Sequence, residues 1–600
     1  MTRTNGNTPA KHPHHRAAEL VDALSTPAGD VVPHPALDQA VEVDQPTQKG
    51  LDPVVFGVAA VVSIAFVVWG LASTSSLGTA SGKALDWVMT NTGWLFVLTS
   101  SGFVVFVIWL AMSKYGTIPL GRDDEDPEFR TSSWIAMMFS AGMGIGLMFY
   151  GVSEPLSHFV TPPPGTGEDA DAAAQNAMAT TMFHWTLHPW AIYAVVGLAI
   201  AYGVYRKGRV QLISAAFAPL IGDRASGGAG KVIDMFAIFA TLFGSATSLG
   251  LGALQISSGL EIVGDIGPLG NGALVVIITV LTVAFVLSAV SGVAKGIQWL
   301  SNINMVLAVA LALFVFVLGP TIFILNLVPT SLGSYVQDLA MMAARTGAEG
   351  AETEAWLSGW TIFYWAWWLS WTPFVGMFIA RISRGRTIRQ FVTGVLLVPS
   401  VVSVIWFCVL GGTAIDLQRD GTDIANAGGL EDQLFGTLDA LPLATLASIV
   451  VMVLVGIFFV SGADAASIVM GSLSERGTTE PRRAVVVFWG VATGAVAAVM
   501  LLAGGEDALT GLQTITIVAA LPFVVIMIGL AAALVRDLRH DPLVVRRRYG
   551  EEAVEQAVIA GVTEHGDDFV LSIEPVDPEP DADGPADDPA DPESAGTPAR

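Results

Sequence analysis

Aromatic side chains gather in two short stretches of this otherwise aliphatic chain. Six of the 16 tryptophans fall between residues 356 and 371: Trp356, Trp360, Trp365, Trp367, Trp368 and Trp371. A second cluster contains Trp185, Trp190 and Tyr193. Aromatic faces attract a cation that cannot donate hydrogen bonds, and cages of this kind bind quaternary ammonium groups. The two clusters favour such a cage, and structural aromatics remain the alternative.

Glycines and a few polar residues interrupt the apolar segments near these clusters. The run Gly142-Met143-Gly144-Ile145-Gly146 contains a small-residue packing motif, but its three alternate glycines also leave backbone open to a ligand or ion. Asp464 is the acidic residue predicted to lie deepest in a span, with Asp234 and Glu261 near the ends of another. An intramembrane carboxylate suggests function, although a structural role for Asp464 is an equal alternative. We expect His184 and His188 to be structural.

The composition predicts that membrane-spanning helices position these residues. Hydrophobic residues make up 52% of the chain and charged residues only 14%, against about 25% charged in soluble domains. Apolar blocks of roughly 20 residues cross a bilayer as helices, because hydrocarbon offers no partner to unpaired backbone groups. The expected fold is an all-α integral membrane protein with twelve spans: 54–73, 93–113, 134–151, 181–205, 232–260, 272–293, 302–326, 356–381, 389–413, 442–470, 484–503 and 512–535.

Polar tails flank the predicted transmembrane domain, 51–540. Residues 1–50 contain no apolar signal segment, and we expect them to be disordered. A cytoplasmic region, 541–600, begins with a short helix near 550–562 and becomes acidic, Pro-rich and disordered after about 565. The single cysteine, Cys408, excludes an internal disulfide. No basic patch suggests nucleic-acid binding, and Arg546–Arg548 is expected to face anionic lipid.

The loop charges predict an orientation. With the amino terminus inside, sixteen Lys and Arg lie in the cytoplasmic loops, and only Lys83, Arg345 and Arg419 lie outside. This bias places both termini in the cytoplasm. The amphipathic stretch 331–345 is expected to lie along the outer interface.

Two of the predicted spans look broken. The third contains the glycine run 142–146, and the eighth contains the stretch 367–373, which ends in Pro373. These spans are five apart and enter the membrane from opposite sides, so spans 3–7 and 8–12 are predicted to be inverted repeats. Broken helices at matching positions of such repeats indicate a substrate site near the midplane of the bilayer.

Several motifs resemble the betaine/choline/carnitine transporter family over roughly residues 50–540. They are AGMGIGLMFYGVSEPL (141–156), FHWTLHPWAIY (183–193), SLGLGALQI (248–256), GPTIFILN (319–326) and YWAWWLSWTPFVGMFIARISRGRTIRQF (364–391). The resemblance implies a homotrimer with a five-plus-five inverted-repeat (LeuT-like) core and alternating access. The implied substrate-binding residues are the cage Trp185, Trp190, Tyr193 and Trp368, the path residues Trp367 and Trp371, and the glycine run with Gly142, Met143, Gly144 and Gly146. Glycine at position 146 accompanies betaine-type substrates in the family, whereas aspartate there favours choline.

The resemblance also implies two sodium sites. One would use Ser140, Met143, Phe458, Ser461 and Gly462, and the other Thr241, Ser245 and Phe374. Sodium-dependent members have adjacent Thr and Ser in the tenth span, so Ser461-Gly462 lacks one oxygen ligand. Sodium-independent members replace the ion by a basic side chain or methionine, and spans five and ten contain no Lys or Arg. Sodium coupling is therefore expected, with no other cofactor.

The expected function is sodium symport of glycine betaine for osmoprotection across a bacterial inner membrane. Its partners would be the substrate, Na⁺, membrane lipid and further copies of the chain. Proton-coupled uptake, or sodium-independent exchange of choline, carnitine, ectoine or a related osmolyte, is the alternative. An enzyme is not expected, because the sequence contains no H-E-x-x-H, G-x-S-x-G or Cys/His metal motif. Osmosensing relatives have a basic carboxy-terminal helix, whereas this tail is acidic.

Overall fold

A computed structural model describes residues 50–142, 144–166, 172–291, 294–426, 428–505 and 507–572. These residues fall into two parts, which meet at residues 538 and 539 and are described separately. Regular structure in the described residues is helical, apart from one isolated bridge between Pro119 and Thr387. The predicted all-α class is confirmed. The predicted amino-terminal tail up to residue 49 and the acidic tail from 573 lie outside the described residues.

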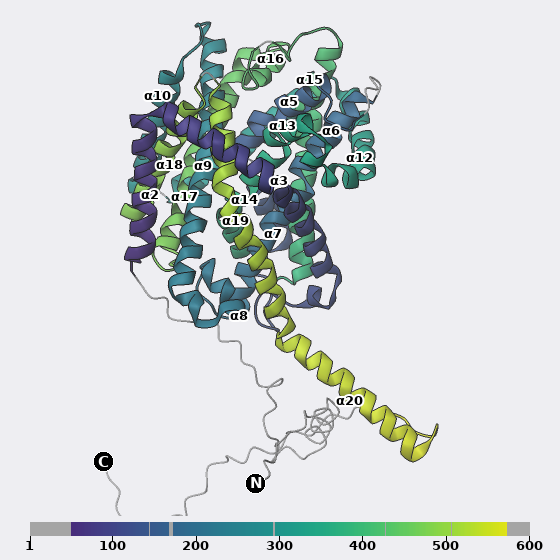
Figure 1. The fold of residues 1–600 in the computed structure, drawn as a ribbon. Helices are drawn as coiled ribbons and strands as arrows, with labels where there is room; N and C mark the ends of the chain where they lie inside the picture. The colour runs from purple at the N-terminus through teal and green to yellow at the C-terminus, as the bar shows by residue number, and fades with distance from the viewer. Residues whose placement is uncertain are drawn as a thin grey trace, which may run out of the picture. The chain divides into compact units, whose positions relative to one another are not determined.

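The predicted spans all fall on helices of the first part (Figure 1). In chain order the main helices are α2 (Pro53–Ala72), α3 (Thr74–Met112), α4 (Thr131–Gly142), α5 (Ile145–Val160), α6 (Ala173–Trp185), α7 (Leu187–Ala201), α9 (Gly228–Gly264), α10 (Asn271–Ser291), α11 (Ala294–Leu318), α12 (Thr321–Ala344), α13 (Ala351–Gly359), α14 (Thr361–Arg381), α15 (Ile388–Arg419), α16 (Gln433–Asp439), α17 (Ala444–Ser474), α18 (Arg483–Ala503) and α19 (Ala508–Arg539). Within the described residues, nine helical segments are long and apolar enough to span a membrane, and the bent pair α11–α12 makes a tenth. The broken pair α4–α5 and the Trp-rich α14 occupy the two remaining predicted positions.

The helix contacts show a symmetry between spans 3–7 and spans 8–12: replacing each helix by its counterpart in the other half gives another observed contact. α14 packs against α7 in the way that α5 packs against α15, and α18 packs against α9 in the way that α10 packs against α17. The fifth span packs against its own counterpart, α9 against α17. In each case, moving five spans along the chain converts one contact into the other. This exchange supports the predicted five-plus-five inverted repeat.

Breaks in the helices differ partly from the prediction. The third span is interrupted between α4 and α5, as expected. α14 continues through Pro373, contrary to the predicted break. Proline lacks the amide that would bond the Leu369 carbonyl, and the Thr372 hydroxyl donates to that carbonyl instead, at 2.6 Å. The fourth span breaks at Thr186, three residues before Pro189, which likewise cannot donate to the preceding turn.

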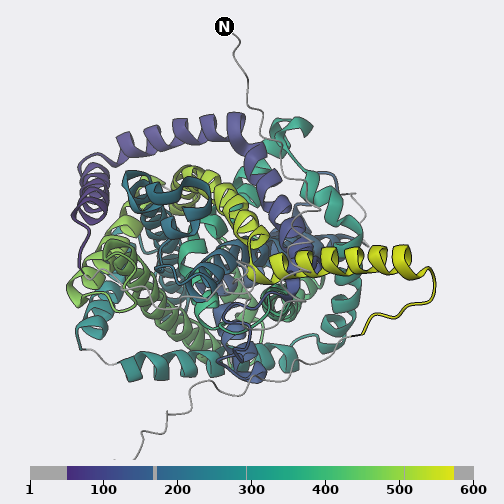
Figure 2. The same ribbon diagram turned by 90° about the horizontal axis from the view of Figure 1, so that it is seen from below.

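Two predicted boundaries are also wrong. The seventh span ends at Leu318 instead of 326, because Gly319-Pro320 stops the helix and α12 turns away by 108°. The amphipathic stretch 331–345 forms the second half of this α12 helix together with its C-cap, and its predicted place along the outer interface stays a prediction. The second span belongs to the 39-residue α3, which begins at Thr74, well before the predicted start at 93. The first half of α3 runs along the margin of the bundle in Figure 2.

The second part contains α20 (Pro542–His565), which is longer than the predicted helix at 550–562. Asp541 caps it by accepting a hydrogen bond from the Leu543 amide at 3.0 Å. Arg547 pairs with Glu551 one turn later, at 2.9 Å. The basic run Arg546–Arg548 therefore lies in the first two turns of a helix, not in a loop.

Candidate functional site

The break in the third span opens the amino-terminal end of α5 toward the aromatic clusters. Gly144 precedes α5 in an extended conformation. The first amides of a helix have no partner within it, and they carry the positive end of the helix dipole. Gly144, Gly146 and Leu147 line a cavity of about 40 Å³, which we call the cage cavity. This helix end can therefore bind a negative group inside the cavity.

The rest of the cage cavity consists of the predicted aromatic residues. Its remaining lining residues are Trp185, Pro189, Trp190, Tyr193, Trp367, Trp368, Trp371, Val375 and Ser403. None of its lining residues has a side chain that is charged at neutral pH. The structure thus brings together the substrate-site residues predicted in the described part of the chain, except Gly142, which ends α4. Met143 lies outside the described residues.

The rings of the cage meet mostly edge to face. The Trp185 and Trp368 centroids are 4.9 Å apart at an interplanar angle of 72°, and those of Trp190 and Tyr193 are 5.3 Å apart at 78°. Tyr193 and Trp368 are 6.4 Å apart. Trp367 stacks on Trp368 at 4.6 Å and 16°. Aromatic rings from α6, α7 and α14 therefore line one small volume, the residue type that a cation–π cage requires.

Gly146 is the point where the glycine run touches the cage. A Cβ atom at this position would lie 2.7 Å from Cη2 of Trp367 and 2.9 Å from Cη2 of Trp185. Both distances are too short for carbon atoms, so any side chain at 146 must displace the two rings. The requirement for glycine here comes from close packing, not from a left-handed backbone conformation.

Four tryptophans that line the cage cavity donate their indole N–H groups to buried acceptors. Trp185 donates to Glu154 Oε2 at 2.6 Å, and Trp368 donates to the His184 carbonyl at 3.1 Å. Trp371 donates to the Gly244 carbonyl at 3.0 Å, and Trp367 lies 3.3 Å from the same oxygen. Buried polar groups without partners are costly, so these bonds hold the ring planes in place.

Glu154 is a buried carboxylate beside the cage that the sequence analysis missed. It is fully buried, and Oε2 accepts from the Tyr364 hydroxyl at 2.5 Å as well as from Trp185. The predicted span ended at 151, which placed Glu154 outside the membrane, whereas α5 continues to Val160. Asp464, named as the deepest carboxylate, is only half-buried. The signal that could have revealed Glu154 is its i,i+4 spacing from His158 within an apolar run.

The other predicted polar residues have structural partners. Asp234 accepts hydrogen bonds from the Ser214 amide and hydroxyl at 3.0 and 2.7 Å. Glu261 accepts from the Leu269 amide at 2.8 Å. His188 stacks on Trp365 at 4.9 Å. His184 bonds to Glu154, and so it supports the cage from behind.

Five of the eight predicted sodium ligands line a second cavity of about 220 Å³, which shares Gly144, Trp371 and Val375 with the cage cavity. The predicted ligands among its lining residues are Ser245, Phe374, Phe458, Ser461 and Gly462. Thr241 does not line this cavity; it is fully buried and donates to the Ala237 carbonyl at 2.8 Å. Met143 and the side chain of Ser140 lie outside the description. Members of both predicted sets thus line one space beside the cage.

Comparison with known proteins identifies this arrangement. Residues 54–543 match the profile of the BCCT (betaine/carnitine/choline) family of transporters. The chain belongs to this family. Its identification as a multi-pass membrane transporter, and not an enzyme, is thereby confirmed.

Characterised relatives cover most of the chain. The BCCT protein described here is 47% identical over 547 residues to the betaine/ectoine transporter LcoP of Corynebacterium glutamicum, covering 91% of this chain and 87% of that protein. It is 45% identical to the glycine betaine transporter OpuD of Bacillus subtilis, covering 81% of this chain and 94% of OpuD. Glycine betaine transporter 1 of Vibrio parahaemolyticus is 42% identical, with coverages of 81% and 94%.

Proposed function

We propose that this BCCT protein is a secondary active importer of a quaternary-ammonium compatible solute, glycine betaine first, driven by sodium and serving osmoprotection. The observation that carries the proposal is the cage cavity, which is lined by tryptophan and tyrosine side chains and by the residues at the amino terminus of α5. The relatives named for glycine betaine transport support the same substrate.

The cage cavity suits a zwitterion better than a simple cation. Trp185, Trp190, Tyr193 and Trp368 offer faces to a trimethylammonium group. The free amides at the start of α5 offer hydrogen bonds and a positive dipole to a carboxylate. Choline has no carboxylate to use that helix end. Gly146 leaves the helix end accessible, since any side chain there would occupy the space between the rings.

Sodium coupling is supported by the second cavity. Ser245 from α9 and Ser461 from α17 place hydroxyls on its wall. Sodium, like other hard cations, prefers several oxygen ligands. Ser461 currently donates to the Ile457 carbonyl at 2.9 Å, an arrangement that leaves its oxygen lone pairs available. Backbone carbonyls or water would replace the hydroxyl that position 462 lacks.

The proposal includes an assembly and a location. We propose a homotrimer in the bacterial inner membrane with both termini in the cytoplasm. The orientation is supported by the excess of Lys and Arg in the loops assigned to the cytoplasm, sixteen against three.

Uptake of labelled glycine betaine into proteoliposomes tests the proposal, with either an inward sodium gradient or an inward proton gradient imposed. Accumulation driven by sodium alone is the expected result. Ser461→Ala should raise the sodium concentration needed for half-maximal uptake. The matched control is Ser467→Ala on the same helix, whose hydroxyl donates to Ala463 and does not line the cavity. Accumulation driven only by protons would contradict sodium coupling, and no saturable uptake would contradict the substrate.

Ectoine is the second candidate substrate, favoured by the printed activity of LcoP. Ectoine also has a carboxylate, and its positive charge is delocalised over the planar amidinium group of its ring, which can stack on tryptophan. Competition between labelled glycine betaine and unlabelled ectoine or choline in the same vesicles ranks the three.

A further inference from the structure

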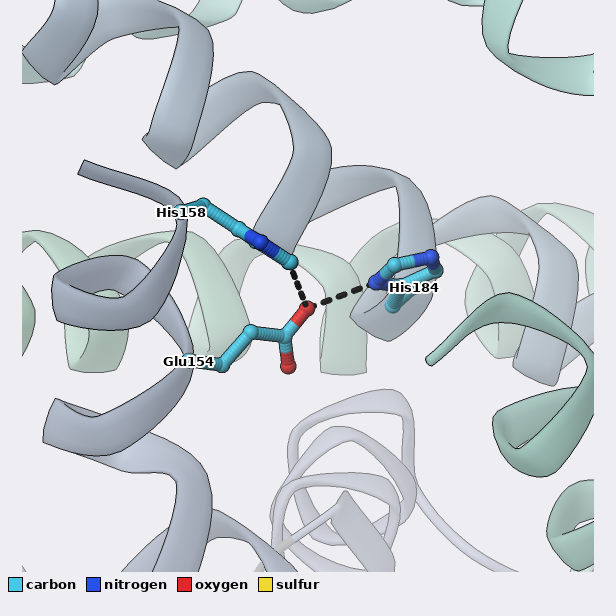
Figure 3. Close-up of side chains that lie close together, drawn as sticks. All are labelled: Glu154, His158 and His184. Carbon is cyan, nitrogen blue, oxygen red and sulfur yellow. Dashed lines mark hydrogen bonds and ion pairs between the residues drawn. The ribbon is translucent and has the colours of Figure 1, made fainter. Parts of the chain in front are cut away.

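Three buried side chains meet beside the indole N–H of Trp185, which donates to one of them, Glu154. Glu154 and His158 lie one turn apart on α5, and His184 comes from α6 (Figure 3). Glu154 Oε1 accepts a hydrogen bond from His184 Nδ1 at 2.6 Å and lies 3.5 Å from His158 Nε2. The three side chains are at most 1% exposed. Within the described residues, they form the cluster of His and acidic side chains close enough to hold one metal ion.

The chemistry of the cluster matches that of zinc. Two imidazole nitrogens and one carboxylate oxygen make up a common three-ligand zinc set with an open fourth position. In such sites, second-layer hydrogen bonds orient the ligands. Here His184 Nε2 lies 2.9 Å from Thr361 Oγ1. Trp185 and Tyr364 both bond the other oxygen of Glu154. Hydrogen bonds on the side away from the metal position therefore orient the ligand atoms of His184 and Glu154.

His158 adds an independent sign of a ligand site. Its Nε2 is buried, and no atom of the described residues gives it a hydrogen bond of good geometry. Buried nitrogens of this kind are rare in native structures. His158 also lines a cavity of about 450 Å³, together with Trp356, Trp360 and residues of the 425–433 loop. In the proposed orientation that loop is on the outer side, so an ion entering this cavity from outside would reach His158.

Two of the three distances between ligand atoms are close to those of a tetrahedral site. The third, between the two imidazole nitrogens, is at most 4.8 Å and must close to about the same value. Ligand atoms about 2.0–2.1 Å from a tetrahedral zinc lie roughly 3.3 Å from one another. The His158–Glu154 distance already meets this value, and the His184–Glu154 pair must separate by under an ångström. The positive charge of Arg345, which acts on both imidazoles, opposes metal binding, and the carboxylate of Glu154 offsets it.

We propose that Glu154, His158 and His184 form a zinc site reached from the outer face, with water as the fourth ligand. Zinc binding would draw Glu154 Oε1 toward the metal and shift the carboxylate that holds Trp185. External zinc would then lower substrate uptake. The metal-binding part of the proposal is independent of which solute the protein carries.

Calorimetric titration of ZnCl₂ into the purified, metal-stripped full-length protein tests the site. The key variant is His158→Phe, which keeps a ring against Trp360, now 4.7 Å away, and removes the nitrogen. We expect one zinc bound by the wild-type protein and at least tenfold weaker binding by the variant. His565→Gln, which changes an exposed histidine of α20, is the matched control and should bind zinc like the wild type. Equal affinity in wild type and His158→Phe would overturn the proposal.

Cobalt(II) gives a second test that needs no variant. Cobalt bound to the wild-type protein should show the intense visible absorption of a tetrahedral complex, and zinc should abolish it. An octahedral, weakly absorbing spectrum would contradict the site. In proteoliposomes, external zinc should inhibit wild-type uptake more than tenfold more potently than His158→Phe uptake. Equal inhibition of both would show that zinc inhibits uptake at another site, and would contradict the proposed effect of this cluster on transport.

Discussion

Replacing Trp368 by leucine tests the cage most directly. Its ring lines the cage cavity and meets Trp185 and Tyr193 edge to face, with centroids 4.9 and 6.4 Å away. Leucine retains apolar bulk but removes one aromatic face. A desolvated cation–π contact contributes about 2 kcal/mol, and about 1.4 kcal/mol corresponds to a tenfold change in affinity. We therefore expect binding of glycine betaine to weaken about 30-fold.

Equilibrium binding of labelled glycine betaine to the purified protein measures this change without interference from transport rates. Trp368→Phe, which restores a smaller face, should recover part of the affinity. Trp489→Leu is the matched control: Trp489 is equally buried and donates to Ser474 Oγ at 2.9 Å, but it lies in α18 and does not line the cage. It should lower thermal stability and leave affinity unchanged. A change of less than twofold for Trp368→Leu would refute the cage.

Three further results are expected. Gly146→Asp should lower glycine betaine uptake at least tenfold, because its Cβ must displace two rings, and should shift preference toward choline; an unchanged competition profile would contradict the role of this position. Burial raises the pKa of Asp52, but hydrogen bonds from Lys231 and two backbone amides outweigh it and hold the pKa below its ordinary value. The stabilisation by Asp52 is thus present above about pH 4 and is lost as pH falls through the lowered pKa. The difference in melting temperature between wild type and Asp52→Asn should therefore close in acid. A constant difference would argue against a stabilising Asp52–Lys231 ion pair. Deleting residues 566–600 should leave any osmotic activation of uptake intact, since an acidic tail is repelled by anionic lipid.

The cage could be predicted from sequence because its members are unusual where they stand. An interfacial role places tryptophans at the ends of a span. Trp367 and Trp368 instead lie near the middle of one. The glycine run predicted the break before α5, because glycine weakens a helix. Type and position in one segment were sufficient for both features.

The support behind the cage could not be predicted, because it depends on contacts between segments. Glu154 and His184 are 30 residues apart, and their hydrogen bond exists only once α5 and α6 pack together. A boundary error of a few residues was enough to assign Glu154 to a loop. The break expected at Pro373 failed for a local reason, because the hydroxyl of Thr372 replaces the lost amide donor.

The contact at Gly244 has a consequence for how the protein moves. The α9 backbone comes so close to α14 here that a Cβ would lie 2.7 Å from that of Ser370. Because Gly244 has no side chain, no side chain of α9 interlocks with α14 at this contact. The two helices can therefore slide past one another here without first separating. Small sliding of packed helices is the shear type of motion, as distinct from rotation about a hinge. We expect α9 to slide along α14 during the transport cycle. The hydrogen bonds from the indoles of Trp367 and Trp371 to the Gly244 carbonyl should limit the extent of this sliding.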